Sequence, residues 1–208
     1  MASPPKRYYT PEEYLALERA AEYKSEYVGG EIFAMTGTSV DHNTIAGNIL
    51  RLLGNQFQGR PCRVFMSDLR VQVAATGMYI YPDVIAVCGP LEFAGGQRDT
   101  LFNPTVIVEI LSPSTELYDR GAKFDHYARL PSLTEYVLVA QDQMRVEHFT
   151  RQGDGWLLTE VDAPDDILRL PLLDAALPLV AIYEHVEFPA PAGPNPPAPF
   201  PRREGGDG

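Results

Sequence analysis

Two short apolar runs, each with one carboxylate inside it, constrain the fold of this chain most strongly. The first covers residues 79–87 and holds Asp83, and the second covers residues 104–111 and holds Glu109. Both runs are rich in β-branched residues and end at turn residues, which predicts buried strands. A carboxylate in a strand core is costly unless it is paired or bound to a cation. Two such acids on neighbouring strands therefore suggest a divalent-cation site.

A helix is expected to follow the second run, beginning near Glu116. Its predicted core face consists of Leu117, Gly121, Phe124 and Ala128. Asp119, Lys123 and Tyr127 recur every four residues on an adjoining stripe. If this helix packs on the strands, that stripe borders the two acids. Lys123 can then stabilise a developing negative charge or orient a water molecule.

The residues alone also allow a purely structural interpretation. Asp83 follows Pro82 and can form a turn at the end of a strand. Glu109 and Lys123 can form a structural salt bridge. Both alternatives stay open at this point.

The remaining pattern predicts further helices and strands around this centre. A Thr-Pro-Glu-Glu capping box at Thr10 predicts a helix to about Tyr23, with Tyr14, Leu17 and Ala21 as its apolar side. A second helix is expected from Ser39 or Asp41 to about Gln58. A hairpin is expected at 26–35, turning at Gly29 and Gly30. Strands are expected at 63–74 (with a kink at Ser67-Asp68), 135–139, 145–150, 156–161 and 167–170.

Three further residues are candidates for the edge of the site. Glu31 either faces the site or is a solvated residue of the hairpin. His42, in the first turn of the second helix, can touch a phosphate or a metal-bound water, but a packing or capping role is the alternative. Asp68 either lies near the site or forms a turn.

Charge and cysteine content limit the class of protein. The chain of 208 residues carries a formal net charge of −11, which argues against a generic nucleic-acid binder with a basic surface. A metal-dependent nuclease remains allowed because its site needs carboxylates, and a bound cation offsets them. Cys62 and Cys88 form no zinc-type cluster and are expected to be buried, reduced thiols.

The chain is expected to divide into three parts. Residues 1–9 form a loose N-terminus, residues 10–188 form a single domain, and the Pro- and Gly-rich residues 189–208 form a disordered tail. No run has the length of a membrane-spanning helix, and the N-terminus lacks a signal-peptide pattern. A cytoplasmic protein without a membrane partner is therefore expected.

The order of these motifs resembles a known family. Pro82-Asp83, the strand ending Val108-Glu109-Ile110-Leu111-Ser112-Pro113-Ser114-Thr115, and the Asp119, Lys123, Tyr127 spacing look like the Uma-type restriction endonucleases. These are bacterial proteins of the PD-(D/E)XK nuclease superfamily. Further matching motifs are Thr10 to Tyr14, Gly30 to Phe33 with Met35, His42, and Glu135-Tyr136. The resemblance extends over roughly residues 8 to 186.

The resemblance implies a fold and a site. The fold would be α/β, a mixed central sheet flanked by helices with an αβββαβ restriction-endonuclease-like core and extra C-terminal strands. Asp83 and Glu109 would hold Mg²⁺ or Mn²⁺. The superfamily's lysine usually lies two residues after the second acid, where this chain has Leu111. Lys123 on the following helix would take its role. Glu31, His42, Asp119 and Tyr127 would support this set.

The function implied is metal-dependent hydrolysis of DNA phosphodiester bonds, and analogy with enzymes that cut two strands suggests a homodimer. Two alternatives remain. One is a catalytically silent nuclease fold used for binding or regulation, which the acidic total favours. The other is a metal-dependent hydrolase of a small phosphate substrate, which would predict a closed pocket instead of an open groove.

Overall fold

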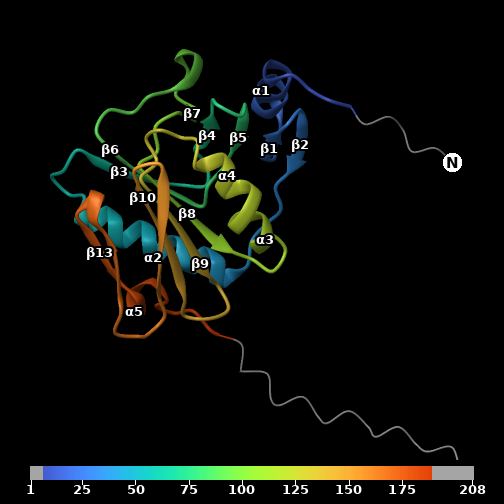
Figure 1. Ribbon diagram of the computed structural model, residues 1–208. Coiled ribbons are helices and arrows are strands. Elements are labelled where there is room, and N and C mark those ends of the chain that lie inside the picture. The colour runs from blue at the N-terminus through green and yellow to red at the C-terminus, as the bar shows by residue number, and fades with distance from the viewer. Residues whose placement is uncertain (1–6, 189–208) are drawn as a thin grey trace, which may run out of the picture.

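The computed structural model describes residues 7–188 and shows a mixed α/β fold (Figure 1). Its largest sheet has six strands in the order β11-β10-β9-β8-β6-β3. These are β3 (Cys62–Met66), β6 (Val84–Cys88), β8 (Val106–Leu111), β9 (Glu135–Ala140), β10 (Val146–Gln152) and β11 (Gly155–Val161). Only the β8–β9 pair in this sheet is parallel. The predicted fold class is confirmed.

A second sheet of five strands lies beside the first, in the order β2-β1-β5-β4-β7. It contains β1 (Ser25–Val28), β2 (Glu31–Ala34), β4 (Arg70–Val73), β5 (Met78–Ile80) and β7 (Thr100–Leu101). The expected strands at 63–74 and 79–87 are each divided between the two sheets, so the prediction of one central sheet was too simple. The breaks fall at Ser67-Asp68 and at Tyr81-Pro82-Asp83. A separate hairpin pairs β12 (Ile167–Leu170) with β13 (Ala175–Pro178).

The helices complete an αβββαβ order around the six-stranded sheet. They are α1 (Pro11–Ala20), α2 (Val40–Gln56), α3 (Glu116–Tyr118), a π-helical turn η2 (Asp119–Lys123), α4 (Phe124–Tyr127) and α5 (Leu179–Ile182). Short 3₁₀ turns are η1 (Ala94–Gly96) and η3 (Pro171–Leu173). The core order is α2, β3, β6, β8, the α3–α4 segment and β9.

Local sequence explains where the first elements begin and turn. Thr10 and Glu13 form the predicted reciprocal capping box at the start of α1. Ser39 caps α2 by accepting a hydrogen bond from the backbone N–H of His42 at 3.0 Å. Gly29 and Gly30 take positive φ values of 58° and 90° between β1 and β2, as the predicted tight turn requires. The apolar side of α1 was only partly predicted, because Tyr14 is buried while Leu17 is exposed.

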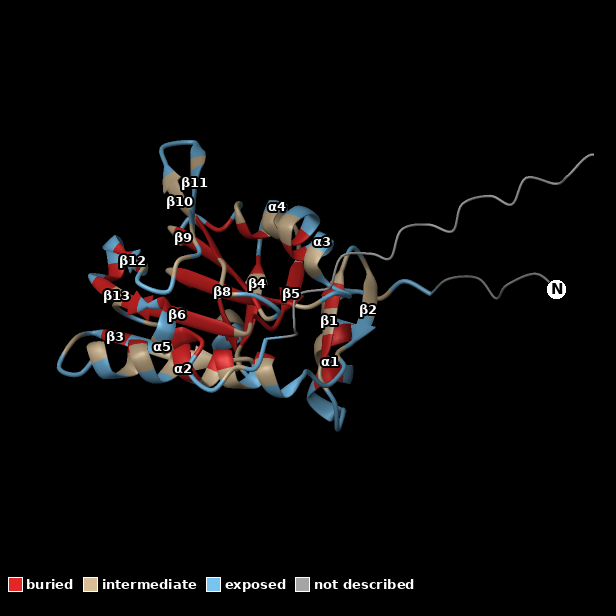
Figure 2. Ribbon diagram, turned by 90° about the horizontal axis from the view of Figure 1, so that it is seen from below, coloured by how far each residue is buried: buried red, intermediate tan, exposed pale blue. Residues whose placement is uncertain are grey.

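Two apolar clusters cover the two faces of the six-stranded sheet. The central strands of this sheet are buried along most of their length (Figure 2). Alternate residues of each strand enter opposite clusters, as the strand period requires. Val108 and Ile110 of β8 pack toward α2, β13 and α5. Ile107 and Leu111 pack with Tyr127 and Leu138 on the other face. Glu109 has the parity of Ile107, so it belongs to the face covered by α4.

The predicted core face of the helix after β8 was only partly right, since Phe124 alone of that face packs against the core cluster and stacks on Tyr136. Leu117 is 88% exposed and Gly121 is exposed, whereas Asp119, Lys123 and Tyr127 are buried. The stripe chosen as the polar border therefore faces the interior. It can do so because its polar groups find partners there, which offsets the cost of burying them.

The prediction for the two cysteines was also wrong. Cys62 and Cys88 are bonded to each other, at directly paired positions of β3 and β6. The two cysteines are 26 residues apart in the sequence, and they meet only because of the register in which β3 pairs with β6.

Across residues 7–188, no helix combines the length and apolar character needed to cross a membrane. The predicted disordered tail at 189–208 lies outside the described residues.

Candidate active site

Strand register brings the two central acids together. In the antiparallel β6–β8 pair, Val84 lies opposite Val108, so the next position places Asp83 beside Glu109. The two strands therefore bring both carboxylates to one pocket, where Glu109 faces the α3–α4 segment and Asp83 reaches toward α2.

Asp83 is held by a strand and a helix. One oxygen, Oδ2, accepts a hydrogen bond from the backbone N–H of Ile110 at 2.8 Å. The same oxygen lies 3.1 Å from Nε2 of His42, in the first turn of α2. The side chain of His42 is only 9% exposed, and its Nδ1 has no hydrogen-bond partner among the described residues. His42 thus orients Asp83 and leaves one polar atom for a further partner.

Glu109 is held from the opposite side. Nζ of Lys123 lies 2.8 Å from its Oε1, and the hydroxyl of Tyr127 donates a hydrogen bond of 2.7 Å to the same oxygen. Lys123 also lies 3.1 Å from Oδ1 of Asp119. Glu109 thus contacts Lys123 and Tyr127 on one side of the helical segment, and Asp119 contacts Lys123 there. The backbone carbonyl of Asp119 accepts a hydrogen bond from Tyr136 at 2.9 Å, which anchors the π-helical turn to β9.

Burial and crowding set the protonation of this cluster. Complete burial raises the pKa of Glu109 to about 8, against the lowering effect of Lys123, and the carboxylates of Asp83 and Asp119 add to the rise. Burial alone would lower the pKa of Lys123, but Glu109, Glu26 and Asp119 raise it well above its ordinary value. Lys123 is therefore charged at neutral pH. Several carboxyl groups share one ammonium group, and this crowding together with burial holds Glu109 toward its protonated form.

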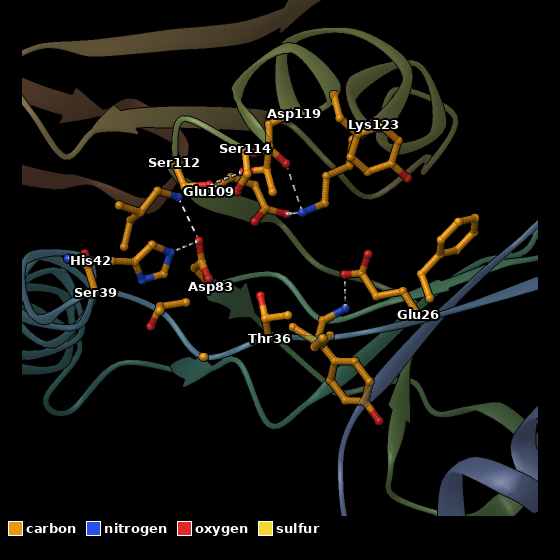
Figure 3. Close-up of a pocket in the computed structure, with 18 of the residues that line it drawn as sticks. Glu26, Thr36, Ser39, His42, Asp83, Glu109, Ser112, Ser114, Asp119 and Lys123 are labelled. Atoms are coloured by element: carbon orange, nitrogen blue, oxygen red, sulfur yellow. Dashed lines mark hydrogen bonds and ion pairs between the residues drawn. The ribbon is translucent and has the colours of Figure 1, made fainter.

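These groups line a pocket of about 350 Å³ (Figure 3). One wall is the segment 33–39 between β2 and α2, and the other is the turn from Ser112 to Asp119. Six Ser and Thr side chains line it: Thr36, Thr38, Ser39, Ser112, Ser114 and Thr115. Hydroxyl groups can donate hydrogen bonds to phosphate oxygens. Lys123 is the single Lys or Arg among the lining residues.

Glu26 is the pocket acid that sequence reasoning missed. It lines the pocket and points into it from β1, whereas the predicted Glu31 is not among the lining residues. Hairpin register explains the difference, since Glu26 lies opposite Phe33 and Glu31 lies opposite Val28 beside the turn. Both acids share one face of the hairpin, but Glu26 is two residues farther from the turn. Burial raises the pKa of Glu26, while Lys123 lowers it.

Asp68 lies outside this pocket. Its side chain is 92% exposed and forms an ion pair of 2.9 Å with Lys24. It occupies the turn between β3 and β4, as the second interpretation of its sequence position predicted.

The carboxylates of Asp83 and Glu109 fit a magnesium ion whose remaining ligands are waters and substrate phosphates. Across residues 7–188, no group of three or more His, Cys, Asp or Glu side chains is arranged to hold a metal. Magnesium in phosphate-processing sites is bound through one or two carboxylates, with waters and substrate phosphates completing the octahedron. Asp83 and Glu109 supply that number of carboxylates in one pocket.

The αβββαβ order and the paired acids at the sheet edge define a restriction-endonuclease-like α/β protein. The solved structures include a similar fold, described as a "putative nuclease belonging to DUF820" from Anabaena variabilis ATCC 29413. That chain superposes with a TM-score of 0.69 at 22% identity, over 84% of this chain and 97% of the other.

Residues 11–179 match the family described as "Uma2: Putative restriction endonuclease". Two proteins of Synechocystis sp. are also similar. "Uncharacterized protein sll1609" is 39% identical over 73% of this chain and 86% of its own length. "Uncharacterized protein slr1290" is 37% identical over 86% of this chain and 93% of its own length. The chain belongs to the Uma2 family, so the family predicted from its motifs is confirmed.

Proposed function

We propose that this protein is a metal-dependent endonuclease that hydrolyses phosphodiester bonds of DNA in the pocket beside Asp83 and Glu109. The observation that carries the proposal is the convergence of these two acids with Lys123 in one pocket. Family membership supports the reaction class, since the family carries the description "Putative restriction endonuclease".

Each side chain has a role that follows from its contacts. Asp83 and Glu109 would hold Mg²⁺ or Mn²⁺, and His42 keeps Asp83 oriented through Oδ2. A bound cation of this kind polarises a phosphate and lowers the pKa of a coordinated water. Lys123 is charged and within hydrogen-bonding distance of Glu109, so it can donate to a phosphate oxygen as negative charge develops there. Tyr127 and Asp119 fix the position of Lys123 and its partner carboxylate.

A plasmid-nicking assay with Mg²⁺ or Mn²⁺ tests this proposal. Wild-type protein should convert supercoiled DNA to open-circle or linear forms, or cut circular single-stranded DNA assayed beside it. Asp83→Asn and Glu109→Gln should each lose at least a hundredfold in rate, since each removes a charge that would hold the cation. Asp165→Asn is the matched control, because Asp165 is an exposed acid outside the pocket. Equal cleavage by all four proteins would point to a contaminating nuclease and contradict the proposal.

A silent binding module is the second candidate, and one observation favours it. Oε1 of Glu109 is already engaged by Lys123 and Tyr127, as in a structural ion pair. This candidate predicts that wild-type protein leaves plasmid, single-stranded DNA, RNA and phosphomonoesters uncut at millimolar Mg²⁺ or Mn²⁺. Hydrolysis of the phosphomonoester alone would instead indicate a hydrolase of small phosphate substrates.

A further inference from the structure

Two of the three aromatic side chains that line the pocket are exposed, while the third, Tyr81, is buried. Phe33 of β2 and Tyr118 of α3 both line the pocket, one from each wall. Phe33 is 49% exposed and Tyr118 is 36% exposed. The packed aromatic clusters of residues 7–188 are built from other rings, around Tyr14 and around Phe124. Phe33 and Tyr118 therefore contribute little to the core and keep ring surface open beside the acids.

The hairpin fixes Phe33 next to the reacting groups. Phe33 is the register partner of Glu26, whose carboxylate points into the pocket. Tyr118 immediately precedes Asp119, which contacts Lys123. Both rings thus lie beside a pocket acid, and they line the same pocket as Asp83 and Glu109.

The charge of the pocket disfavours a double helix as the ligand. Duplex DNA carries one phosphate charge about every 1.7 Å along its axis, and proteins that grip it do so with several Lys and Arg side chains. The pocket lining offers one such side chain, Lys123, against the four acids Glu26, Asp83, Glu109 and Asp119. The chain as a whole is also acidic, at −11. Affinity must therefore come from the bases more than from the phosphates.

Only an unpaired base can use the two rings. In a duplex the faces of each base are covered by its stacked neighbours, so an aromatic side chain reaches a face only by unstacking the bases, which costs free energy. Single strands expose base faces, and stacking on protein aromatics is tolerant of sequence. The six hydroxyl residues of the pocket can then contact the few phosphates next to the stacked base.

We infer that Phe33 and Tyr118 stack on an unpaired base beside the scissile phosphate, so that the substrate of this site is single-stranded DNA. This inference rests on the proposed nuclease function but concerns the substrate class, and binding tests it without cleavage.

Fluorescence anisotropy with a labelled single strand of about 12 nucleotides measures the affinity directly. The same strand in a blunt duplex is the comparison, and Ca²⁺ replaces Mg²⁺ so that binding is followed without turnover; a gel run afterwards verifies uncut DNA. Wild-type protein should bind the single strand at least tenfold more tightly than the duplex.

Substitutions separate stacking from general apolar contact. Phe33→Ala and Tyr118→Ala should each weaken single-strand binding between about fivefold and a hundredfold, the range expected for losing one stacked base. Phe33→Leu should lose nearly as much as Phe33→Ala, while Tyr118→Phe should bind like wild type. Tyr23→Ala is the matched control, since Tyr23 is 67% exposed and lies outside the pocket. Thermal melting verifies that each variant folds.

Equal affinity for single strand and duplex would overturn the inference, as would unchanged binding in both alanine variants. The nuclease proposal fails differently. Ring-dependent binding of a single strand that stays uncut in Mg²⁺ and Mn²⁺ would uphold the inference about the bound strand and contradict the reaction. Efficient cutting of duplex DNA by Phe33→Ala would uphold the nuclease proposal and contradict the inference that the substrate is a single strand.

Discussion

Nζ of Lys123 lies 2.8 Å from Oε1 of Glu109, although one residue is in a π-helical turn and the other is in the middle of a central strand. Both side chains are over 90% buried. A buried ion pair is costly to form, but breaking it by removing one partner is costly as well, by about 3–5 kcal/mol. The pair therefore ties the α3–α4 segment to the sheet and at the same time places a cation beside the acids.

The first prediction concerns this pair. Lys123→Met should lower the free energy of unfolding by about 3 kcal/mol in urea denaturation, because Glu109 and Asp119 lose their buried cation. Lys123→Met combined with Glu109→Gln should recover part of that loss. A double-mutant cycle gives the coupling between the two positions. Strictly additive effects would show that the two groups do not interact in solution.

Stability of the metal-free protein should depend on pH through Glu109. Its pKa in the folded protein is about 8, above its ordinary value of 4.5, so the folded state holds this proton more tightly than the unfolded state. The resulting stability is fully present below about pH 4.5 and is lost as the pH rises toward 8. The loss should be on the order of a few kcal/mol.

Glu109→Gln is the control for this pH dependence, because glutamine cannot titrate. Urea denaturation between pH 5 and pH 9, in the presence of a chelator, should show a flatter profile for the variant than for wild type. The same slope in both proteins would assign the pH dependence to another group.

His42 should act through Asp83. His42→Ala removes the contact of 3.1 Å to Oδ2 and should weaken Mn²⁺ binding by about tenfold, the lower end of the range for groups that orient metal ligands. His42→Gln can still donate a hydrogen bond and should retain more affinity. Calorimetric titration of the three proteins gives the ranking. A His42→Ala variant with wild-type affinity would confine His42 to packing.

Reduction of the Cys62–Cys88 bond should destabilise the protein without altering the site. The bond spans 26 residues, and closing a loop of this size stabilises by about 3 kcal/mol in the chain-entropy treatment. Dithiothreitol should lower Tm in wild type and leave the Cys62→Ser/Cys88→Ser double variant unchanged. Mn²⁺ affinity should stay constant in both, since Cys88 lies at the opposite end of β6 from Asp83. A parallel loss of metal affinity would link the bond to the pocket.

Much of this arrangement was predictable from local pattern. The strand around Glu109, the capping box at Thr10 and the Gly29-Gly30 turn follow from β-branched runs, caps and turn residues, which act over a few positions. The meeting of Glu109 and Lys123 was also foreseen, both as a catalytic set and as a structural salt bridge.

The remaining features depend on contacts that sequence spacing does not contain. Asp119, Lys123 and Tyr127 look like a polar border, yet they face the interior because Glu109 and Tyr136 meet them there. To identify Glu26 as the pocket acid in place of Glu31, one needs the register of the β1–β2 hairpin. The bond between Cys62 and Cys88 needed the register of another strand pair.

Calorimetric titration of Mn²⁺ into wild-type protein and Asp83→Asn tests the central claim most directly, because it probes the cation site before any substrate is chosen. The account predicts saturable binding by wild type at millimolar Mn²⁺ or below, none by Asp83→Asn, and wild-type binding by Asp165→Asn. Absence of binding to wild type, or equal binding by Asp83→Asn, would contradict it and leave Asp83, Glu109 and Lys123 as a structural charge network.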